Sequence, residues 1–331
     1  MALYLCGTAA LDVMRYLRST NGGEIPGTPA RPRRLGNALN SDRQLNELGE
    51  SAQRLLSHVQ GKVEVLVPRR RQHTRTSRLE THLWTHDIPR GAFIDLGNGI
   101  YLSSPAFLFV QLASKLGEVE LIMLGLELCG SYSLWRLPAP SFGPSQGDLR
   151  TEATYELSPA LTAARLKSFI IRMDGERGVV RARNAAKYVL DNDASPMESA
   201  VYLLLCLPRH LGGRGLPKPL FNVKVNVTTS TTTTSRYPDL YWPTRALDVE
   251  YQSDQDHSGD WARYRDARRQ VELEAENVTV LPLTRHQVMD ADEFNAFATS
   301  VRRMLGVRSR PLPRDWERRY LKLRTVVLGT W

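Results

Sequence analysis

The chain has 331 residues, 42% hydrophobic and 24% charged, so it can build two packed domains and does not have the composition of a disordered protein. Its net charge of +9, from 44 basic and 35 acidic residues, favours a polyanionic partner, nucleic acid ahead of an anionic membrane. The three cysteines are widely spaced with no CxxC pair, which argues against a disulfide framework or a structural zinc site and fits a reducing cytosol.

Nothing in the sequence predicts secretion or insertion into a membrane. The amino-terminal apolar stretch is interrupted by Asp12 and Arg15, and it lacks the basic start and long apolar core of a signal peptide. Later apolar runs, such as residues 121–126, fall well short of the ~20 residues that a membrane span needs. We therefore expect a cytoplasmic protein with no membrane partner.

Residues 1–135 predict an accessory α+β domain, mostly helical with short strands, for which DNA binding is a candidate role. Apolar residues recur at helical spacing in the segments 3–18, 41–57, 105–116 and 117–129. Alternation and an Asn-Gly turn signal predict strands at residues 62–67, 92–96 and 100–102. Ser41 or Asp42 is the predicted cap of the second helix, and Ser104-Pro105 opens the third.

The rest of the chain changes from a connector to a pattern typical of a mixed sheet. Residues 136–190 predict a proline-rich linker and then a helical connector that Ser158-Pro159 begins. Within 191–306 the expected order is helix, three strands, helix, strand and helix, at residues 195–207, 221–227, 237–242, 246–252, 260–275, 278–283 and 291–305. This order predicts an α/β domain with an αβββαβ core and a mixed sheet, in a chain that is α+β overall. Residues 228–235 predict a threonine-rich loop, and residues 307–331 a basic tail.

Two carboxylates in the predicted sheet are the first candidates for chemistry. Asp239 and Glu250 are separated by ten residues, which suits a tight hairpin turned at Pro243-Thr244. Adjacent antiparallel strands would place the two carboxylates side by side. Magnesium prefers oxygen ligands and is often held by one or two carboxylates together with water and phosphate. A metal held in this way lowers the pKa of a bound water and stabilises charge on a phosphodiester.

Three further side chains belong to the same candidate site. Strand alternation puts Gln252 on the face of Glu250, where its amide could orient an attacking water without accepting a proton. Asp248 shares this face and is the alternative carboxylate if the strand register differs by two residues. Glu198, on the helix before the sheet, could add a third carboxylate above the same metal.

The alternative is that these carboxylates are solvated surface residues, which is their usual role in hairpin strands. Leu247, Val249 and Tyr251 instead predict a half-buried strand. An acidic residue without a partner is costly in such a strand. The context therefore favours a functional site.

Three short motifs follow one another along the chain: Ser-Pro-Met-Glu at 195–198, Pro-Asp-Leu-Tyr-Trp-Pro at 238–243 and Val-Glu-Tyr-Gln at 249–252. Taken in this order, they resemble the PD-(D/E)XK nucleases, and in particular the DUF559 group, which is related to very-short-patch repair endonucleases. In that group a Ser-Pro-x-Glu helix precedes the sheet, the second strand carries the aspartate and the third carries Glu-x-(acidic or polar). A later helix carries Asp-x-x-Arg, which residues 266–269 match, and residues 278–281 are similar to the strand after it.

This resemblance covers roughly residues 185–305 and implies a restriction-endonuclease-like core that cuts DNA with Mg²⁺ or Mn²⁺. It implies that Asp239 and Glu250 bind the metal and that Gln252 stands at the position of the usual lysine. Glutamine stabilises charge near an attacking water less strongly than lysine does. The glycine-histidine segment that is expected after the third strand is also changed, although His257 is kept. A homodimer is compatible with this family, since many such nucleases pair to cut both strands.

Basic residues in two regions are candidates for contacting DNA phosphates. Arg69, Arg70 and Arg71, followed by Arg75, form the densest basic stretch of the first hundred residues. In the second half the candidates are His257, Arg265 and Arg269, and the two arginines are i,i+4 neighbours on a predicted helix. Solvated loops and an ordinary charged helix face are the alternatives.

The first 130 residues loosely resemble the amino-terminal half of AbiEi-like abortive-infection antitoxins, proteins that often bind their own promoter. The likeness is carried by residues 9–11 and by Gly-Ile-Tyr-Leu-Ser-Ser-Pro at 99–105, while helix-turn-helix spacing is not evident in residues 3–57. Residues 127–132 (Glu-Leu-Cys-Gly-Ser-Tyr) are distinctive without indicating a chemistry, and Cys129 suits packing better than a nucleophile.

The main hypothesis is thus a cytoplasmic, metal-dependent DNA endonuclease with an accessory amino-terminal region. The alternative is a non-catalytic DNA-binding regulator, of the abortive-infection antitoxin type, with a degenerate nuclease core. A structural interaction protein is a third hypothesis.

Overall fold

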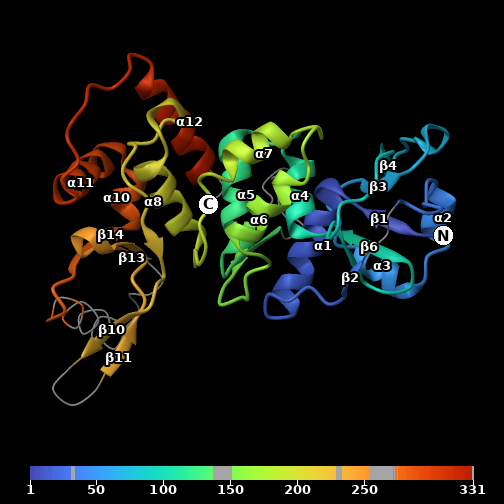
Figure 1. The fold of residues 1–331 in the computed structure, drawn as a ribbon, viewed down its shortest axis with the longest axis horizontal. Coiled ribbons are helices and arrows are strands. Elements are labelled where there is room, and N and C mark those ends of the chain that lie inside the picture. The colour runs from blue at the N-terminus through green and yellow to red at the C-terminus, as the bar shows by residue number, and fades with distance from the viewer. Residues whose placement is uncertain are drawn as a thin grey trace, which may run out of the picture. The chain divides into compact units, whose positions relative to one another are not determined.

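The computed structural model describes residues 1–30, 34–136, 151–228, 233–252, 271, 273 and 275–329. The chain forms two compact units, Met1–Val189 and Leu190–Trp331 (Figure 1). Both units combine helices with mixed sheets, which confirms the predicted α+β class. Within the described ranges, none of the helices has both the length and the hydrophobicity that crossing a bilayer requires.

A six-stranded sheet organises the first unit. Its strands in spatial order are β2 (Thr28–Ala30), β5 (Phe93–Asp95), β6 (Ile100–Ser103), β1 (Leu3–Leu5), β3 (Val63–Val67) and β4 (Leu79–Leu83). β1 lies parallel to β6 and antiparallel to β3, and β3 lies parallel to β4. The remaining elements are α1 (Gly7–Thr20), α2 (Asp42–Asn46), α3 (Glu50–Leu56), η1 (Arg70–Gln72), α4 (Pro105–Leu112), α5 (Glu118–Cys129), α6 (Ala163–Ile171), α7 (Val179–Ala185) and the paired strands β7 (Ser133–Arg136) and β8 (Thr151–Thr154).

Two of the predicted helices in this unit are wrong in part. The helix predicted over residues 3–18 is preceded by a strand, because Gly7 has a φ of +59° and separates β1 from α1. A short apolar run such as Leu3–Leu5 does not distinguish strand from helix by periodicity alone. The helix predicted over 41–57 is divided into α2 and α3, with Gly49 as the N-cap of the second piece.

The predicted Asn-Gly turn and the predicted cap at Ser104 are confirmed in the first unit. Asn98 and Gly99 both have positive φ, 52° and 77°, in the turn between β5 and β6. Ser104 caps α4 by accepting a hydrogen bond from the backbone N–H of Phe107. The cap predicted at Ser158 is wrong, because α6 begins later and its N-cap is Thr162.

The second unit is built on a four-stranded sheet of order β14-β13-β12-β9. Its elements are α8 (Pro196–Cys206), η2 (Arg209–Leu211), β9 (Leu220–Phe221), β10 (Val225–Thr228), β11 (Thr233–Arg236), β12 (Leu240–Trp242), η3 (Pro243–Arg245), β13 (Leu247–Gln252), β14 (Thr279–Thr284), α10 (Arg285–Met289), α11 (Ala291–Met304) and α12 (Trp316–Leu328). β12 is antiparallel to both β9 and β13, whereas β13 and β14 are parallel. Residues 271, 273 and 275 are helical, and the rest of the helix predicted between β13 and β14 lies outside the described residues.

One predicted strand of this sheet is wrong. The segment 221–227 was expected to be continuous, but Asn222 has a φ of +45° and ends β9. The chain then forms a separate hairpin of β10 and β11, so the ends of the threonine-rich run expected as a loop are strands.

Helix α8 is the centre of the second unit. All eleven of its residues are buried, as expected for a helix that is covered on several sides. Tyr202 of α8 packs edge-to-face on Phe221 of β9, with ring centroids 5.4 Å apart. α12 packs against α8 and η2, so part of the predicted basic tail is a docked helix. Trp316 and Tyr320 of α12 stack on each other, and the guanidinium of Arg214 lies 4.4 Å from the Trp316 ring.

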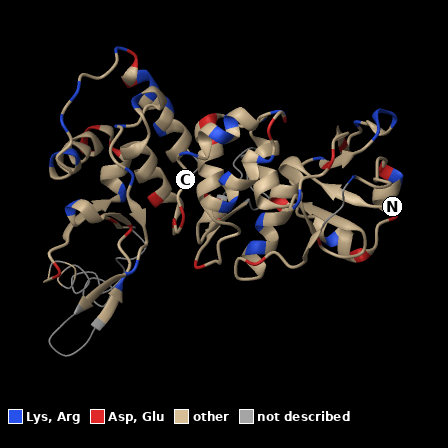
Figure 2. Cartoon of the chain, viewed as in Figure 1, with Lys and Arg blue, Asp and Glu red and all other residues tan. Residues whose placement is uncertain are grey.

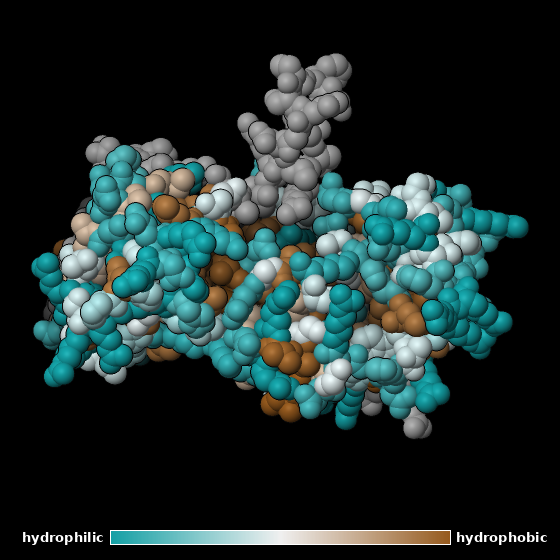
Figure 3. All heavy atoms as spheres, turned by 90° about the horizontal axis from the view of Figure 1, so that it is seen from above, coloured by the Kyte–Doolittle hydropathy of each residue, from teal (hydrophilic) through white to brown (hydrophobic). Residues whose placement is uncertain are grey.

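Large apolar side chains are concentrated inside the two units. On the face shown in Figure 3, hydrophilic residues cover most of the surface, and hydrophobic residues lie between them in small groups. The largest exceptions are Ile171 and Val180, each 68% exposed. Cys6, Cys129 and Cys206 are buried and form no disulfide, so the interpretation of Cys129 as a packing residue agrees with its place in α5.

A buried ion pair joins α1 to α5 in the first unit. Arg15 donates two hydrogen bonds to Glu127, from Nε to Oε1 at 2.9 Å and from Nη2 to Oε2 at 2.5 Å. Glu127 also accepts a hydrogen bond from the backbone N–H of Leu134, at 3.0 Å, and Arg18 donates to its main-chain carbonyl. The distinctive segment at 127–132 is therefore explained by structure, because its glutamate ties two helices and the following strand together.

We predict that Glu127→Ala lowers the free energy of unfolding by about 3–5 kcal/mol, because it leaves the Arg15 guanidinium buried without its partner. Urea denaturation measures the loss. Glu118→Ala, the same change at a half-buried position in the first turn of α5, is the control and is expected to cost less than about 1 kcal/mol. Equal losses for the two variants would contradict the assignment.

Candidate functional site

The pairing of β12 with β13 brings two predicted site residues together. Leu240 lies opposite Val249, and Trp242 lies opposite Leu247. One step beyond the last pair, the same register places Asp239 opposite Glu250. The turn between the strands is η3, at the predicted Pro243-Thr244 position. The predicted hairpin is therefore confirmed, with its carboxylates at its open end.

Asp239 is anchored to the neighbouring strand by its own side chain. Its Oδ2 accepts a hydrogen bond of 2.8 Å from the backbone N–H of Tyr251. A carboxylate held by a backbone donor has a defined direction, unlike a solvated surface side chain. Asp239 therefore contacts β13 just beyond Glu250.

Glu198 reaches this region from the first turn of α8. Ser195 is the N-cap, and its Oγ accepts a hydrogen bond of 3.1 Å from the backbone N–H of Glu198, as the Ser-Pro signal predicts. The side chain of Glu198 is buried, and its Oε2 accepts from the Asn222 amide at 2.8 Å and from the Ala194 N–H at 3.3 Å. Burial, and then the charges of Asp239 and Asp193, raise the pKa of Glu198 well above its usual range.

Asp193 belongs to the same cluster, and sequence reasoning missed it. It is fully buried, two residues before the N-cap of α8, and it accepts hydrogen bonds from Ser199 Oγ and the Ser195 backbone N–H. Burial raises its pKa, these hydrogen bonds lower it in part, and the charge of Asp239 adds to the rise, to a pKa of about 8. An acidic residue just before a helix is common, so the only available signal was its closeness to the Ser-Pro-Met-Glu motif.

Gln252 and Asp248 lie on either side of Glu250 along β13. Gln252 is the last residue of the strand, is half-buried and pairs with Thr284 of β14. Asp248 is fully buried and lies between Tyr241 and Val280 on the neighbouring strands. Because the predicted register is confirmed, Asp248 is not needed as the alternative carboxylate opposite Asp239.

The acidic cluster offers carboxylate oxygens, the ligands that a hard cation prefers, but it does not form a complete set of metal ligands. Among the residues that the structure describes, no group of three or more His, Cys, Asp or Glu side chains is arranged to hold a metal ion. Mg²⁺ usually keeps several waters and takes only one or two carboxylates from a protein. Asp239 and Glu250 thus remain a two-carboxylate candidate.

The predicted DNA-contacting residues lie in different parts of the chain. Arg69, Arg70 and Arg71 are exposed at η1, just after β3, in a loop with several basic side chains (Figure 2). Arg75 is also exposed and has an ion pair with Glu80, with Nε and Oε2 3.5 Å apart. The other candidates, His257, Arg265 and Arg269, lie outside the described residues.

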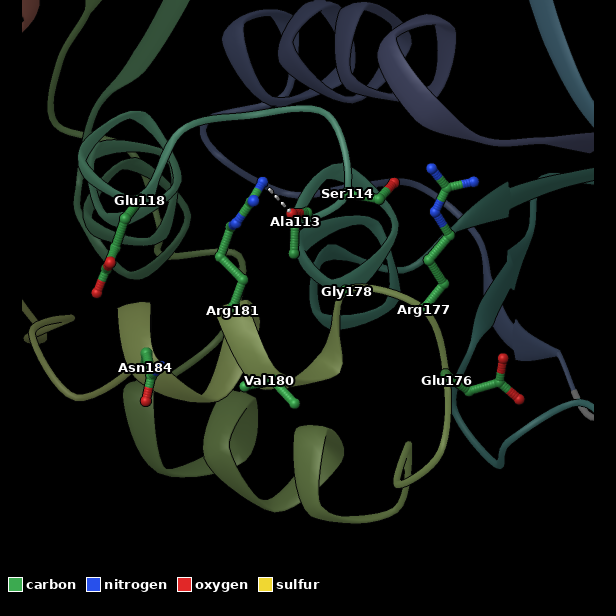
Figure 4. A pocket seen from close by; sticks show the side chains of 9 residues that line it. All are labelled: Ala113, Ser114, Glu118, Glu176, Arg177, Gly178, Val180, Arg181 and Asn184. Carbon is green, nitrogen blue, oxygen red and sulfur yellow. Dashed lines mark hydrogen bonds between the residues drawn. The ribbon is translucent and has the colours of Figure 1, made fainter.

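A pocket of about 540 Å³ lies in the first unit, and none of the residues that line it is a predicted site residue (Figure 4). It is formed where the end of α4, the start of α5 and the turn before α7 meet. Arg181 lies on its wall and donates to the carbonyls of Ala113 and Leu116, so this guanidinium caps the end of α4. Glu176, on the same wall, is paired with His86 at 2.6 Å. Both charged side chains therefore already have structural partners.

Comparison with known proteins assigns the chain to no family. No protein-family model matches the chain, and neither a curated protein nor a solved structure matches it significantly.

We predict that the stability of the protein falls as the pH rises from about 4 to about 8. In this window folded Asp193, with its pKa of about 8, holds a proton that the unfolded chain has released at its ordinary value of 3.8. The folded state therefore binds more protons, and each pH unit removes up to about 1.4 kcal/mol. Urea denaturation across this range measures the slope.

Asp193→Asn should flatten this pH dependence, since the amide mimics the protonated acid. Asp292→Asn, at an exposed position on α11, is the control and should keep the wild-type slope. An unchanged slope in Asp193→Asn would contradict the assignment.

Proposed function

We propose that the second unit is a DNA endonuclease of the PD-(D/E)XK type that acts in the cytoplasm with Mg²⁺ or Mn²⁺. The observation that carries the proposal is the β12–β13 hairpin, whose register continues to Asp239 and Glu250 at its open end. The Asp239 carboxylate is held by the backbone of Tyr251, and its charge acts on Glu198. The order of α8, β9, β12, β13 and β14 supports it, because a helix, three strands and a later parallel strand are what the resemblance implies.

The proposed metal ligands are Asp239 and Glu250. Two carboxylates with water and substrate phosphate are an ordinary ligand set for Mg²⁺. A bound cation would supply Lewis-acid stabilisation of charge on the phosphodiester and a lower pKa for its water ligands. The raised pKa of Glu198 supports the assignment, because it reflects the nearby carboxylates Asp239 and Asp193 as well as burial. A group of neighbouring carboxylates is a favourable environment for a cation.

The remaining side chains would position the reactants. Gln252 would orient the attacking water through its amide, which cannot accept the proton. Glu198, held by Asn222 and Ala194, would place a further carboxyl group beside Asp239. DNA is the proposed partner, and two paired copies of the chain would be needed to cut both strands at one place.

The alternative proposal is a DNA-binding regulator of the antitoxin type that has kept the core without its activity. Gln252 at the position of the usual lysine favours it, since the amide stabilises developing charge less strongly. The exposed Arg69–Arg71 run supports DNA binding under either proposal.

We predict that the purified protein cleaves supercoiled plasmid only when Mg²⁺ or Mn²⁺ is present. Asp239→Asn and Glu250→Gln each keep the side-chain shape and remove a charge, so each should lower the cleavage rate at least ~100-fold. Agarose gels report the conversion to nicked and linear DNA. Asp292→Asn, an exposed change in the same unit, is expected to cleave like the wild type. DNA binding without cleavage by the wild type would favour the regulator.

A second prediction concerns the arginine run at η1. Replacing Arg69, Arg70 and Arg71 with alanine should weaken DNA binding for all sequences and reduce the salt slope by up to about 3, because each phosphate contact contributes about 0.9. Fluorescence anisotropy over a range of salt concentrations measures both effects. Replacing exposed Arg54, Arg165 and Arg177 of the same unit removes equal charge and controls for net charge alone. Equal losses in the two triple variants would rule out a localised contact.

A further inference from the structure

Asn222 links two separate parts of the acidic cluster. It follows β9 directly, and its side-chain amide donates one hydrogen bond to Glu198 Oε2 at 2.8 Å and another to the carbonyl of Asn192 at 3.0 Å. Its backbone N–H donates to the carbonyl of Pro238, the residue before Asp239, at 2.9 Å. One residue therefore contacts the segment before α8, Glu198 itself and the strand that leads to Asp239.

The chemistry of asparagine suits this position in two ways. The backbone of Asn222 is left-handed, with a φ of +45°, a conformation that asparagine adopts more readily than most residues. Its amide offers two N–H donors, and both are used. An aspartate of the same shape would offer none and would bring another negative charge to Glu198.

Two hydrogen bonds to the Glu198 side chain reach the same oxygen. Asn222 and the Ala194 N–H both donate to Oε2, and the Ser195 side chain also forms a hydrogen bond with this carboxyl group. These groups are neutral, so they orient the carboxylate without cancelling its charge. Of these groups, Asn222 is the one that also contacts the segment leading to Asp239, so its amide links the orientation of Glu198 to that segment.

We infer that Asn222 is a positioning residue for the carboxylate site, which sets the direction of Glu198 and the approach of Asp239. The inference rests on the proposed nuclease function and deepens it, since nothing in the three sequence motifs points to residue 222. Side chains that hold the ligands of a metal site typically affect metal affinity or activity 10- to 100-fold.

Asn222→Gly tests the inference, because glycine readily adopts the left-handed backbone and removes the side chain that carries the amide. The cleavage rate at saturating DNA should fall at least about tenfold, while the dissociation constant for DNA, measured with Ca²⁺ in place of Mg²⁺, changes less than about twofold. Asn277→Gly is the matched control, since Asn277 is an exposed asparagine of the same unit with a φ of +61°. It should cleave at the wild-type rate.

A stability measurement, which does not depend on cleavage, tests the contact between Asn222 and Glu198 separately from the proposed nuclease function. In urea denaturation, the effects of Asn222→Gly and Glu198→Gln should be non-additive, because the two side chains share a hydrogen bond. An active wild type with an equally active Asn222→Gly variant would overturn the positioning role alone. An inert wild type would overturn the nuclease, and additive effects would overturn the contact itself.

Discussion

The register of β12 against β13 is the constraint on which the candidate site depends. Side chains alternate between the two faces of a strand, so a slip of one residue would move Asp239 away from Glu250 and turn its side chain to the opposite face. Leu240 and Val249 form the last pair before the carboxylates, and both are fully buried. Burial of this apolar pair therefore determines the register, and the register places the two acids opposite each other.

The buried carboxylates of the two units differ in how their charge is balanced. In the first unit, Glu127 accepts hydrogen bonds from Arg15. Glu64 forms hydrogen bonds with His82, Lys115 and Thr8. Burial alone would raise the pKa of Glu64, but these hydrogen bonds lower it to about 2. Both are compensated charges with a structural role.

Two buried acids of the second unit, Asp193 and Glu198, are held differently. The hydrogen bonds to Asp193 and Glu198 come from neutral hydroxyl, amide and backbone donors, and the pKa of each acid is raised. Such an arrangement costs stability when the acids are charged, and it is typical of sites that bind a cation or move a proton. This contrast between the held acids supports the function proposed for the second unit.

Local signals in the sequence determined the elements around the site. The Ser-Pro signal predicted the cap of α8, alternation predicted β13, and the ten-residue spacing of Asp239 and Glu250 predicted their hairpin. Each of these depends on neighbours within a few residues along the chain. The strand at Leu3–Leu5 was missed, because a three-residue apolar run takes its conformation from the strands that it pairs with.

Only the tertiary structure decided which other groups join the carboxylates. Asp193 and Asn222 carry no motif, and the contacts of Asn222 with Glu198 and Pro238 span 24 and 16 residues. Whether an acid is buried and how its pKa shifts depend on such distant neighbours. The sequence by itself determined the helix cap, the hairpin and its two carboxylates, since local backbone preferences are enough to specify them. The packing of α8 against the sheet decided the membership and the charge balance of the cluster, because both arise from chain segments that meet only in the folded protein.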